Sequence, residues 1–164
     1  MSDRILVKAS ELGIAEPGQA LAAVGLGSCV VVALYDPDAR IAGLAHPLLP
    51  EPPGRQGPGK PARMLRYVST AVPELIERMT DAGADPDRLY ARLVGGARMF
   101  VTLLSGNGTP LGERNAEASR SVLASAGVPI RAEAVGGDRG RSVHFRADDG
   151  ELRVTGIGFP DVVL

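Results

Sequence analysis

The apolar residues of the chain fall into short runs that predict strands and two longer periodic stretches that predict helices. The clearest run, residues 29–35, is almost continuously apolar and rich in β-branched residues, which is typical of a strand buried on both faces. An Asp-Pro-Asp turn follows it, and residues 41–46 are expected to return as the second strand of a hairpin. Further strands are predicted at residues 4–8, 89–94, 130–135, 142–147 and 151–155, with a short apolar run at 21–24 and another candidate at 99–104.

Two stretches have helical rather than alternating periodicity. Apolar residues recur at helical spacing from Met64 to Met79, which predicts an amphipathic helix ending near Gly83 that Pro73 should kink or divide. A second helix is predicted at residues 112–126, before Gly127. The pattern therefore predicts an α+β fold, a layered sandwich of mixed β-sheet with two main helices and about seven strands.

Length and composition limit the classes of protein to which the chain can belong. Its 164 residues suit one domain, expected to span residues 1–164, and no repeat or linker divides them. No apolar stretch is long enough to cross a membrane, and the first residues lack the pattern of a signal peptide. A single cysteine fits a reducing compartment, so we expect a cytoplasmic protein. With 18 basic and 19 acidic residues interspersed, a nucleic-acid partner is not expected.

Cys29 is the first candidate for chemistry. A lone cysteine is often only a small buried hydrophobe, and its place at the start of a buried strand favours that interpretation. However, Gly25, Gly27 and Ser28 directly precede it. Glycines let the main chain bend tightly and let a substrate approach it, and backbone N–H groups around Gly27 and Ser28 could hold an oxyanion. A nucleophile and a structural cysteine both remain open on spacing alone.

His46 is the second candidate, at the end of the returning strand. A hairpin of this length can bring Cys29 and His46 side by side, and an adjacent imidazole is the usual activator of a thiol. The alternative is a histidine that only hydrogen-bonds at the end of a strand. His144 alternates with apolar residues in a predicted strand, and one cysteine with two histidines cannot complete a structural zinc site. The glycine-rich segments at 25–27 and 54–61 both fail as nucleotide-binding motifs, so neither a metal nor a cofactor is expected.

Several motifs together resemble the CheD family of chemoreceptor glutamine deamidases, in order and spacing, from about Gly18 to Thr155. They are Gly25-Leu26-Gly27-Ser28-Cys29-Val30, Tyr35-Asp36-Pro37, Gly43-Leu44-Ala45-His46, Leu49-Pro50, Arg66-Tyr67-Val68, Gly95-Gly96-Ala97, Gly112-Glu113-Arg114-Asn115 and Gly136-Gly137-Asp138-Arg139-Gly140-Arg141. The resemblance implies deamidation, and sometimes methyl-ester hydrolysis, on methyl-accepting chemoreceptors. It also implies a CheC-type phosphatase partner, a fold similar to bacterial toxin deamidases, and Cys29 and His46 as the nucleophile and base of a thioester mechanism.

Ala23 departs from the family's pattern, which usually has a threonine there that is implicated in orienting the histidine. We expect the backbone carbonyl of Ala23, or of a near neighbour, to orient His46 in place of a hydroxyl. The competing hypothesis is a catalytically weakened or inactive binding module that regulates receptors or a CheC-type phosphatase.

Overall fold

The computed structural model describes residues 3–52, 61–99 and 108–164, which form two five-stranded sheets and two main helices. The central sheet has the strand order β2 (Leu12–Ala15), β5 (Ile41–Ala45), β4 (Val30–Asp36), β6 (Tyr90–Gly95) and β7 (Ile130–Val135). The outer sheet has the order β1 (Asp3–Leu6), β3 (Gln19–Leu26), β8 (Arg141–Arg146), β9 (Leu152–Thr155) and β10 (Val162–Val163). Each sheet contains one parallel pair, β6–β7 and β1–β3, so both are mixed.

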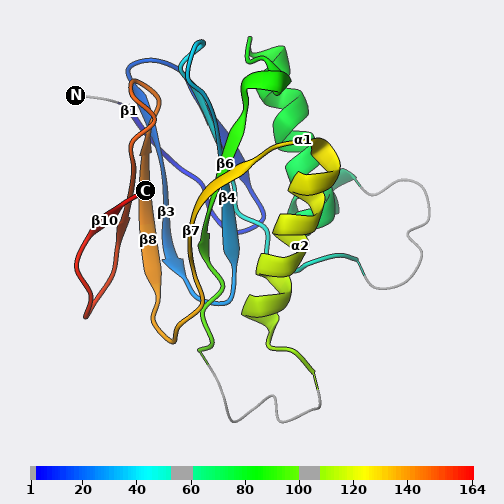
Figure 1. Cartoon of the computed structure of the whole chain (residues 1–164), viewed down its shortest axis with the longest axis vertical. Helices are drawn as coiled ribbons and strands as arrows, with labels where there is room; N and C mark the ends of the chain where they lie inside the picture. The colour runs from blue at the N-terminus through cyan, green and yellow to red at the C-terminus, as the bar shows by residue number, and fades with distance from the viewer. Residues whose placement is uncertain (1–2, 53–60, 100–107) are drawn as a thin grey trace.

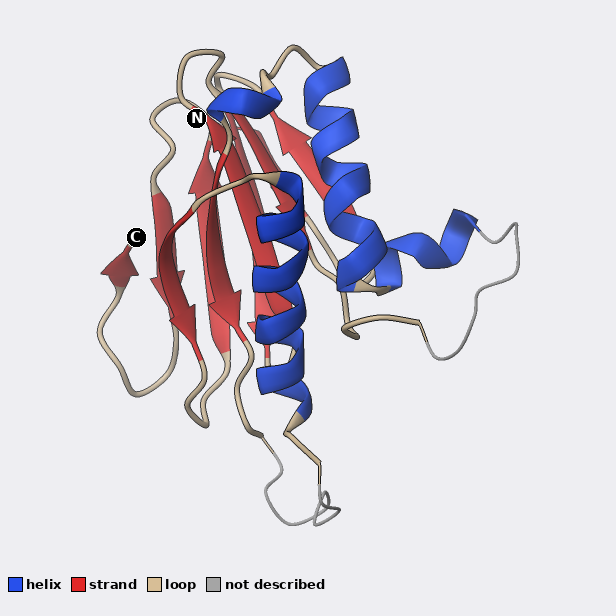
Figure 2. Cartoon of the chain, turned by 45° about the vertical axis from the view of Figure 1, so that its right-hand side comes forward, coloured by secondary structure: helices blue, strands red, loops and turns tan. Residues whose placement is uncertain are grey.

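The helices cover one face of the central sheet, and the outer sheet covers its other face (Figure 1). Helix α1 spans Val68–Asp81, and helix α2 spans Leu111–Ala126. Short 3₁₀ helices occupy Pro61–Arg66 and Pro86–Arg88. Figure 2 shows both long helices on the same side of the strands. The predicted α+β layered sandwich of mixed sheet with two main helices is therefore confirmed.

Strand β4 lies at the centre of this arrangement, and every one of its residues is buried. Its even-numbered residues from Val30 to Leu34 pack in the core under the helices, and its odd-numbered residues from Val31 to Tyr35 pack in the core between the sheets. This two-sided burial confirms what the continuous apolar run predicts. The end of β4 nearest Cys29 is therefore held on both faces.

The structure differs from the predicted elements in several details. Strands β2 and β10 were not predicted, and the short run at 21–24 is part of the longer strand β3. The predicted helical stretch from Met64 is a 3₁₀ helix to Arg66 followed by α1, which continues through Pro73 as one helix. All but the first residue of the candidate strand at 99–104, and all but the last residue of the glycine-rich segment at 54–61, lie outside the described residues. Helix α2 ends, as predicted, before Gly127, which has a left-handed conformation.

A buried carboxylate holds the far end of β4, away from Cys29. Asp36 accepts hydrogen bonds from Arg88 Nε and Nη2 at 3.0 and 2.8 Å and from the backbone N–H groups of Asp38, Ala39 and Asp85. Burial raises the pKa of Asp36, but the Arg88 hydrogen bonds and those from the backbone outweigh it and lower the pKa to about 2. The ionised form of Asp36 is therefore strongly favoured in the folded state.

This pKa predicts how stability depends on acid. Because the folded-state pKa lies below the ordinary value of 3.8, the contribution of Asp36 is fully present above about pH 4 and is lost as the pH falls toward 2. The free-energy difference between the wild type and Asp36→Asn should shrink by about 2 kcal/mol over this interval. Urea unfolding of both proteins at several pH values measures it. A difference that does not change with pH would contradict the assignment.

Among the helices that the structure describes, none is both long enough and apolar enough to cross a membrane.

Candidate active site

The segment between β3 and β4 carries Cys29. Near the end of β3, Gly25 has a φ of 68°, and the pairing of β3 with β8 shifts register between Ala23 and Leu26. A positive φ suits glycine, which explains its place before the turn. The turn through Gly27 and Ser28 then crosses from the outer sheet to the central sheet, so Cys29 lies at the junction of the two sheets.

Three consecutive backbone carbonyls of this turn are held by surrounding elements. Gly27 O accepts from Ala97 N at 2.8 Å, Ser28 O accepts from Asn115 Nδ2 at 3.0 Å, and Cys29 O accepts from Gly96 N at 2.8 Å. Within the described part of the chain, no carbonyl or side chain of another residue accepts a hydrogen bond from the N–H groups of Gly27, Ser28 or Cys29. The three carbonyl oxygens of the turn are therefore used by the protein, whereas the described residues leave its N–H groups without a partner in another residue.

Glycines allow neighbouring backbone segments to pack closely against the Cys29 turn. Gly95 has a φ of 119°, and a Cβ at this position would clash with the carbonyl oxygen of Cys29. A Cβ on Gly112, at the start of α2, would likewise clash with the carbonyl oxygen of Gly96. These close contacts between backbones place the first turn of α2 beside the Cys29 turn.

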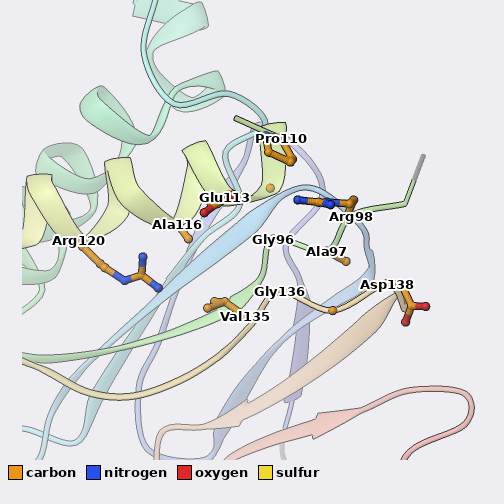
Figure 3. Close-up of a pocket in the computed structure, with 12 residues that line it drawn as sticks. Gly96, Ala97, Arg98, Pro110, Glu113, Ala116, Arg120, Val135, Gly136 and Asp138 are labelled. Atoms are coloured by element: carbon orange, nitrogen blue, oxygen red, sulfur yellow. The ribbon is translucent and has the colours of Figure 1, made fainter. Parts of the chain in front are cut away.

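A cavity of about 560 Å³ opens beside Cys29. It is lined by Gly27, Ser28, Cys29, Ala97, Arg98, Met99, Gly108, Pro110, Leu111 and Gly112. A second cavity of about 560 Å³ adjoins it along α2 and shares Ala97, Arg98, Pro110 and Gly112 with it. Figure 3 shows this second cavity, with the charged side chains of Arg98, Glu113 and Asp138 around it. The surface beside Cys29 is therefore hollowed well beyond the volume of one side chain.

His46 follows β5 and is nearly buried, with 5% of its surface exposed. Its backbone pairs with the segment before β2, through His46 N to Glu11 O at 3.0 Å and Ser10 N to His46 O at 2.8 Å. Its Nδ1 lies 3.1 Å from the carbonyl oxygen of Val7. Since a carbonyl oxygen can only accept, Nδ1 carries the proton in the neutral ring, and Nε2 is left as a proton acceptor.

The carbonyl oxygen that faces Nδ1 of His46 is thus that of Val7, and not, as expected, that of Ala23 or a residue next to it in sequence. Ala23 pairs with Val143 of β8 inside the outer sheet, so its backbone is part of a ladder. Strand β1 ends at Leu6, and Val7 lies just beyond that end, where its carbonyl is free to face the imidazole. The side chain of Ala23 is fully buried in the core between the sheets.

Cys29 and His46 flank the same end of the β4–β5 hairpin. The last pair of the ladder at this end joins Val32 to Ala45, and His46 directly follows Ala45. Cys29 directly precedes β4, which begins at Val30. The hairpin therefore brings the two residues to the same end of the central sheet.

The electrostatics favour the neutral forms of both groups. Burial raises the pKa of the Cys29 thiol, and a hydrogen bond from its own backbone N–H opposes this only in part. Burial lowers the pKa of His46 below its ordinary value of 6.5, while the hydrogen bond to Val7 O and the charge of Glu11 act in the opposite direction. At neutral pH the site therefore holds a thiol and a neutral imidazole.

Asn115 is a residue of this site to which sequence reasoning gave no role. It lies on the buried face of α2 with Gly112, Ala116, Ser119 and Leu123, and it is fully buried. An asparagine at an apolar position of an amphipathic helix is the signal that could have identified it, because a buried amide requires hydrogen-bond partners. His144, by contrast, lies on β8 and pairs with Ala22 and Arg153 in the outer sheet.

A family profile and curated relatives point to the same family by sequence. A family profile described as CheD chemotactic sensory transduction matches residues 48–156. The probable chemoreceptor glutamine deamidase CheD of Caldanaerobacter subterraneus is 42% identical over 138 residues, which cover 84% of this chain and 83% of that protein. The probable chemoreceptor glutamine deamidase CheD 2 of Geobacter metallireducens is 42% identical over 160 residues, 98% of each chain, a span that includes Cys29 and His46.

Among solved structures, a Neisseria meningitidis protein is similar in fold, with a TM-score of 0.54 and 12% sequence identity. The similarity covers 88% of this chain and 75% of that protein.

Proposed function

The chain belongs to the CheD family, and from this premise we propose that it converts glutamine side chains of methyl-accepting chemoreceptors into glutamate. The observation that carries the proposal is the Cys29 turn beside a cavity: its carbonyls accept hydrogen bonds from the protein, while its N–H groups donate to no other residue that the structure describes. N–H groups beside a nucleophile can stabilise the oxyanion of the tetrahedral intermediate that its attack forms. We take residues 1–164 as one deamidase domain.

In the proposed mechanism, Nε2 of His46 takes the proton of the Cys29 thiol as the sulfur attacks the carboxamide carbon of the glutamine. The C=O π electrons move to oxygen, and the backbone N–H groups of Gly27, Ser28 and Cys29 stabilise the resulting oxyanion. When the intermediate collapses, the C–N bond breaks, His46 returns its proton to the nitrogen, and ammonia leaves a thioester on Cys29. His46 then takes a proton from a water molecule as the water oxygen attacks the thioester carbon. When this intermediate collapses, the C–S bond breaks, glutamate leaves, and His46 returns the proton to the sulfur of Cys29.

The adjoining cavities are consistent with a substrate that is part of a protein. The cavity at Cys29 has apolar walls from Met99, Pro110 and Leu111, which suit the aliphatic part of a glutamine side chain. The neighbouring cavity along α2 would accept residues that flank the glutamine. Methyl-ester hydrolysis at the same residue would use the same steps with methanol as the leaving group.

We further propose that the protein works in the cytoplasm and has a CheC-type phosphatase as a second partner. Both proposals rest on the family resemblance. A pull-down of a CheC-type protein from the same organism with the purified chain tests the second.

Mass spectrometry of a receptor tests the proposed activity. The cytoplasmic fragment of a chemoreceptor from the same organism is incubated with the purified protein, digested and analysed. Each deamidated glutamine should gain about one dalton, because nitrogen and hydrogen are replaced by oxygen. A receptor sample without the protein controls for spontaneous deamidation. A receptor that binds the protein but stays unmodified would favour the alternative of a catalytically inactive binding module.

The geometry of His46 predicts that Ala23→Thr will change kcat by less than about tenfold, or about 1.4 kcal/mol. The reason is that Val7 O already accepts from Nδ1, so a hydroxyl at position 23 is not needed to fix the imidazole tautomer. Steady-state assays on the receptor fragment measure the change, and Ala23→Ser controls for the hydroxyl without the extra methyl group. An increase of two or more orders of magnitude would instead show that the natural chain lacks an essential orienting group.

A further inference from the structure

Asn115 joins two segments that the β4–β5 ladder does not connect. The pairs of this ladder run from Asp36 with Ile41 to Val32 with Ala45, and Ser28 and Leu48 lie beyond its last pair. The side-chain amide of Asn115 spans the gap, because Nδ2 donates to Ser28 O and to Leu48 O, each at 3.0 Å. Both hydrogens of the amide group are thus used by the two strand ends.

These two acceptors adjoin the proposed nucleophile and base. Ser28 directly precedes Cys29, and Leu48 is two residues after His46. The orientation of the imidazole is fixed separately, by Val7 O at Nδ1. The amide therefore determines how far apart the two segments lie, while Val7 determines how the ring is turned.

We infer that Asn115 is a positioning residue that holds the Cys29 turn and the segment after His46 at the separation needed for proton transfer. The inference rests on the proposed deamidase function. Proton transfer from thiol to imidazole requires hydrogen-bond distance, and a displacement of about 1 Å by a change outside the reacting groups can cost about 100-fold in rate. Asn115 itself touches neither the substrate cavity nor the reacting atoms, since it is not one of the residues that line either cavity.

The burial of Asn115 supports a role for its two donors in particular. Its Oδ1 is buried and has no hydrogen-bond partner among the residues that the structure describes. A leucine of similar shape would avoid the cost of burying that oxygen, but it would leave Ser28 O and Leu48 O without their donor. The two donated hydrogen bonds are thus what the asparagine supplies at this position.

The test compares Asn115→Leu with a matched control on the same helix face. Ser119 is one turn further along α2, is also fully buried, and donates to the carbonyl oxygen of Asn115 at 2.8 Å. It has no side-chain hydrogen bond to the Cys29 turn or to the segment after His46 within the described residues. Ser119→Ala therefore perturbs the same buried face without removing the bridge. For each protein, kcat and KM on the chemoreceptor fragment, the pH dependence of kcat, and the melting temperature are measured.

A positioning role has a specific signature. Asn115→Leu should lower kcat by about 10- to 100-fold with KM within about twofold, and it should flatten the decline of kcat at acid pH that reports His46. Ser119→Ala should lower the melting temperature but keep the wild-type kcat and pH dependence. If Asn115→Leu does not fold, Asn115→Gln carries the test, because it keeps the amide but moves its donors by one methylene, and its kcat should fall with the same change in pH profile.

Two failures are distinguishable. If the wild type does not deamidate the receptor fragment, the proposed function fails. If the wild type is active and the folded Asn115 variants keep its kcat and pH profile, the function stands and the positioning role of Asn115 is refuted.

Discussion

Replacing Cys29 by alanine should lower the rate of receptor deamidation by at least about 10⁴-fold. The thioester mechanism has no step that can proceed without the sulfur, and the oxyanion-binding N–H groups alone leave only a small residual rate. Cys29→Ser should be almost as inactive, because the lowered pKa of His46 makes it too weak a base for a hydroxyl of much higher pKa. Conversion of the receptor fragment under single-turnover conditions, followed by mass spectrometry, measures both rates.

The control for this prediction is the stability of the folded protein. Cys29 is partly exposed at the wall of its cavity, and the contacts that hold the turn are made by backbone carbonyls. Cys29→Ala should therefore unfold within a few degrees of the wild type in a thermal melt. A variant that is folded and still deamidates at a rate close to the wild type would refute Cys29 as the nucleophile.

The neutral state of the site distinguishes it from one with a preformed thiolate. Burial acts on both groups, raising the pKa of the thiol and lowering that of the imidazole. In the proposed mechanism, the proton therefore moves when the substrate is in place, as a step of general-base catalysis, and the resting thiol is a weak nucleophile. A resting thiol is oxidised or alkylated more slowly than a thiolate, so the neutral state protects the chain's single cysteine between turnovers.

The hairpin that carries the site can be predicted from sequence because its signals are local. Two antiparallel strands are specified by a continuous β-branched run, an Asp-Pro turn and an apolar return strand. Cys29 and His46 lie seventeen positions apart in sequence, at the open end of this hairpin. These local signals make Cys29 and His46 candidates at the same end of one hairpin, and the resemblance to the CheD family is what implies their roles.

Contacts between distant segments cannot be predicted from the same signals. Val7 O and Asn115 reach the site from the end of β1 and from α2, and nothing near them in sequence marks them as partners of His46 or of Ser28. Strand β2 escapes prediction for a related reason. It is four residues long and contains Gly13, where a Cβ would lie 2.8 Å from Val7 Cγ2 and 2.9 Å from Leu21 Cδ2. The glycine weakens the strand signal, but close packing between the sheets requires it.

His46→Gln should lower kcat by about 10²- to 10⁴-fold, the usual contribution of a general base. Glutamine can still donate to Val7 O, so the variant removes proton transfer while keeping the hydrogen bond that fills the site. The pH dependence provides the sharper test. In the wild type, protonation of Nε2 blocks proton acceptance, so activity should be retained at neutral pH and lost as the pH falls through the lowered pKa of His46, below 6.5.

The residual activity of His46→Gln should not show this decline, because the titrating group is gone. Both profiles are measured as rates on the receptor fragment between pH 5 and 8. In this range Asp36 stays ionised, so its contribution to the stability of the fold does not change. His144→Gln is the matched control, since it removes the other histidine from the outer sheet and should leave the acid limb intact. An acid limb that persists in His46→Gln would assign the titration to another group and exclude His46 as the base that activates Cys29.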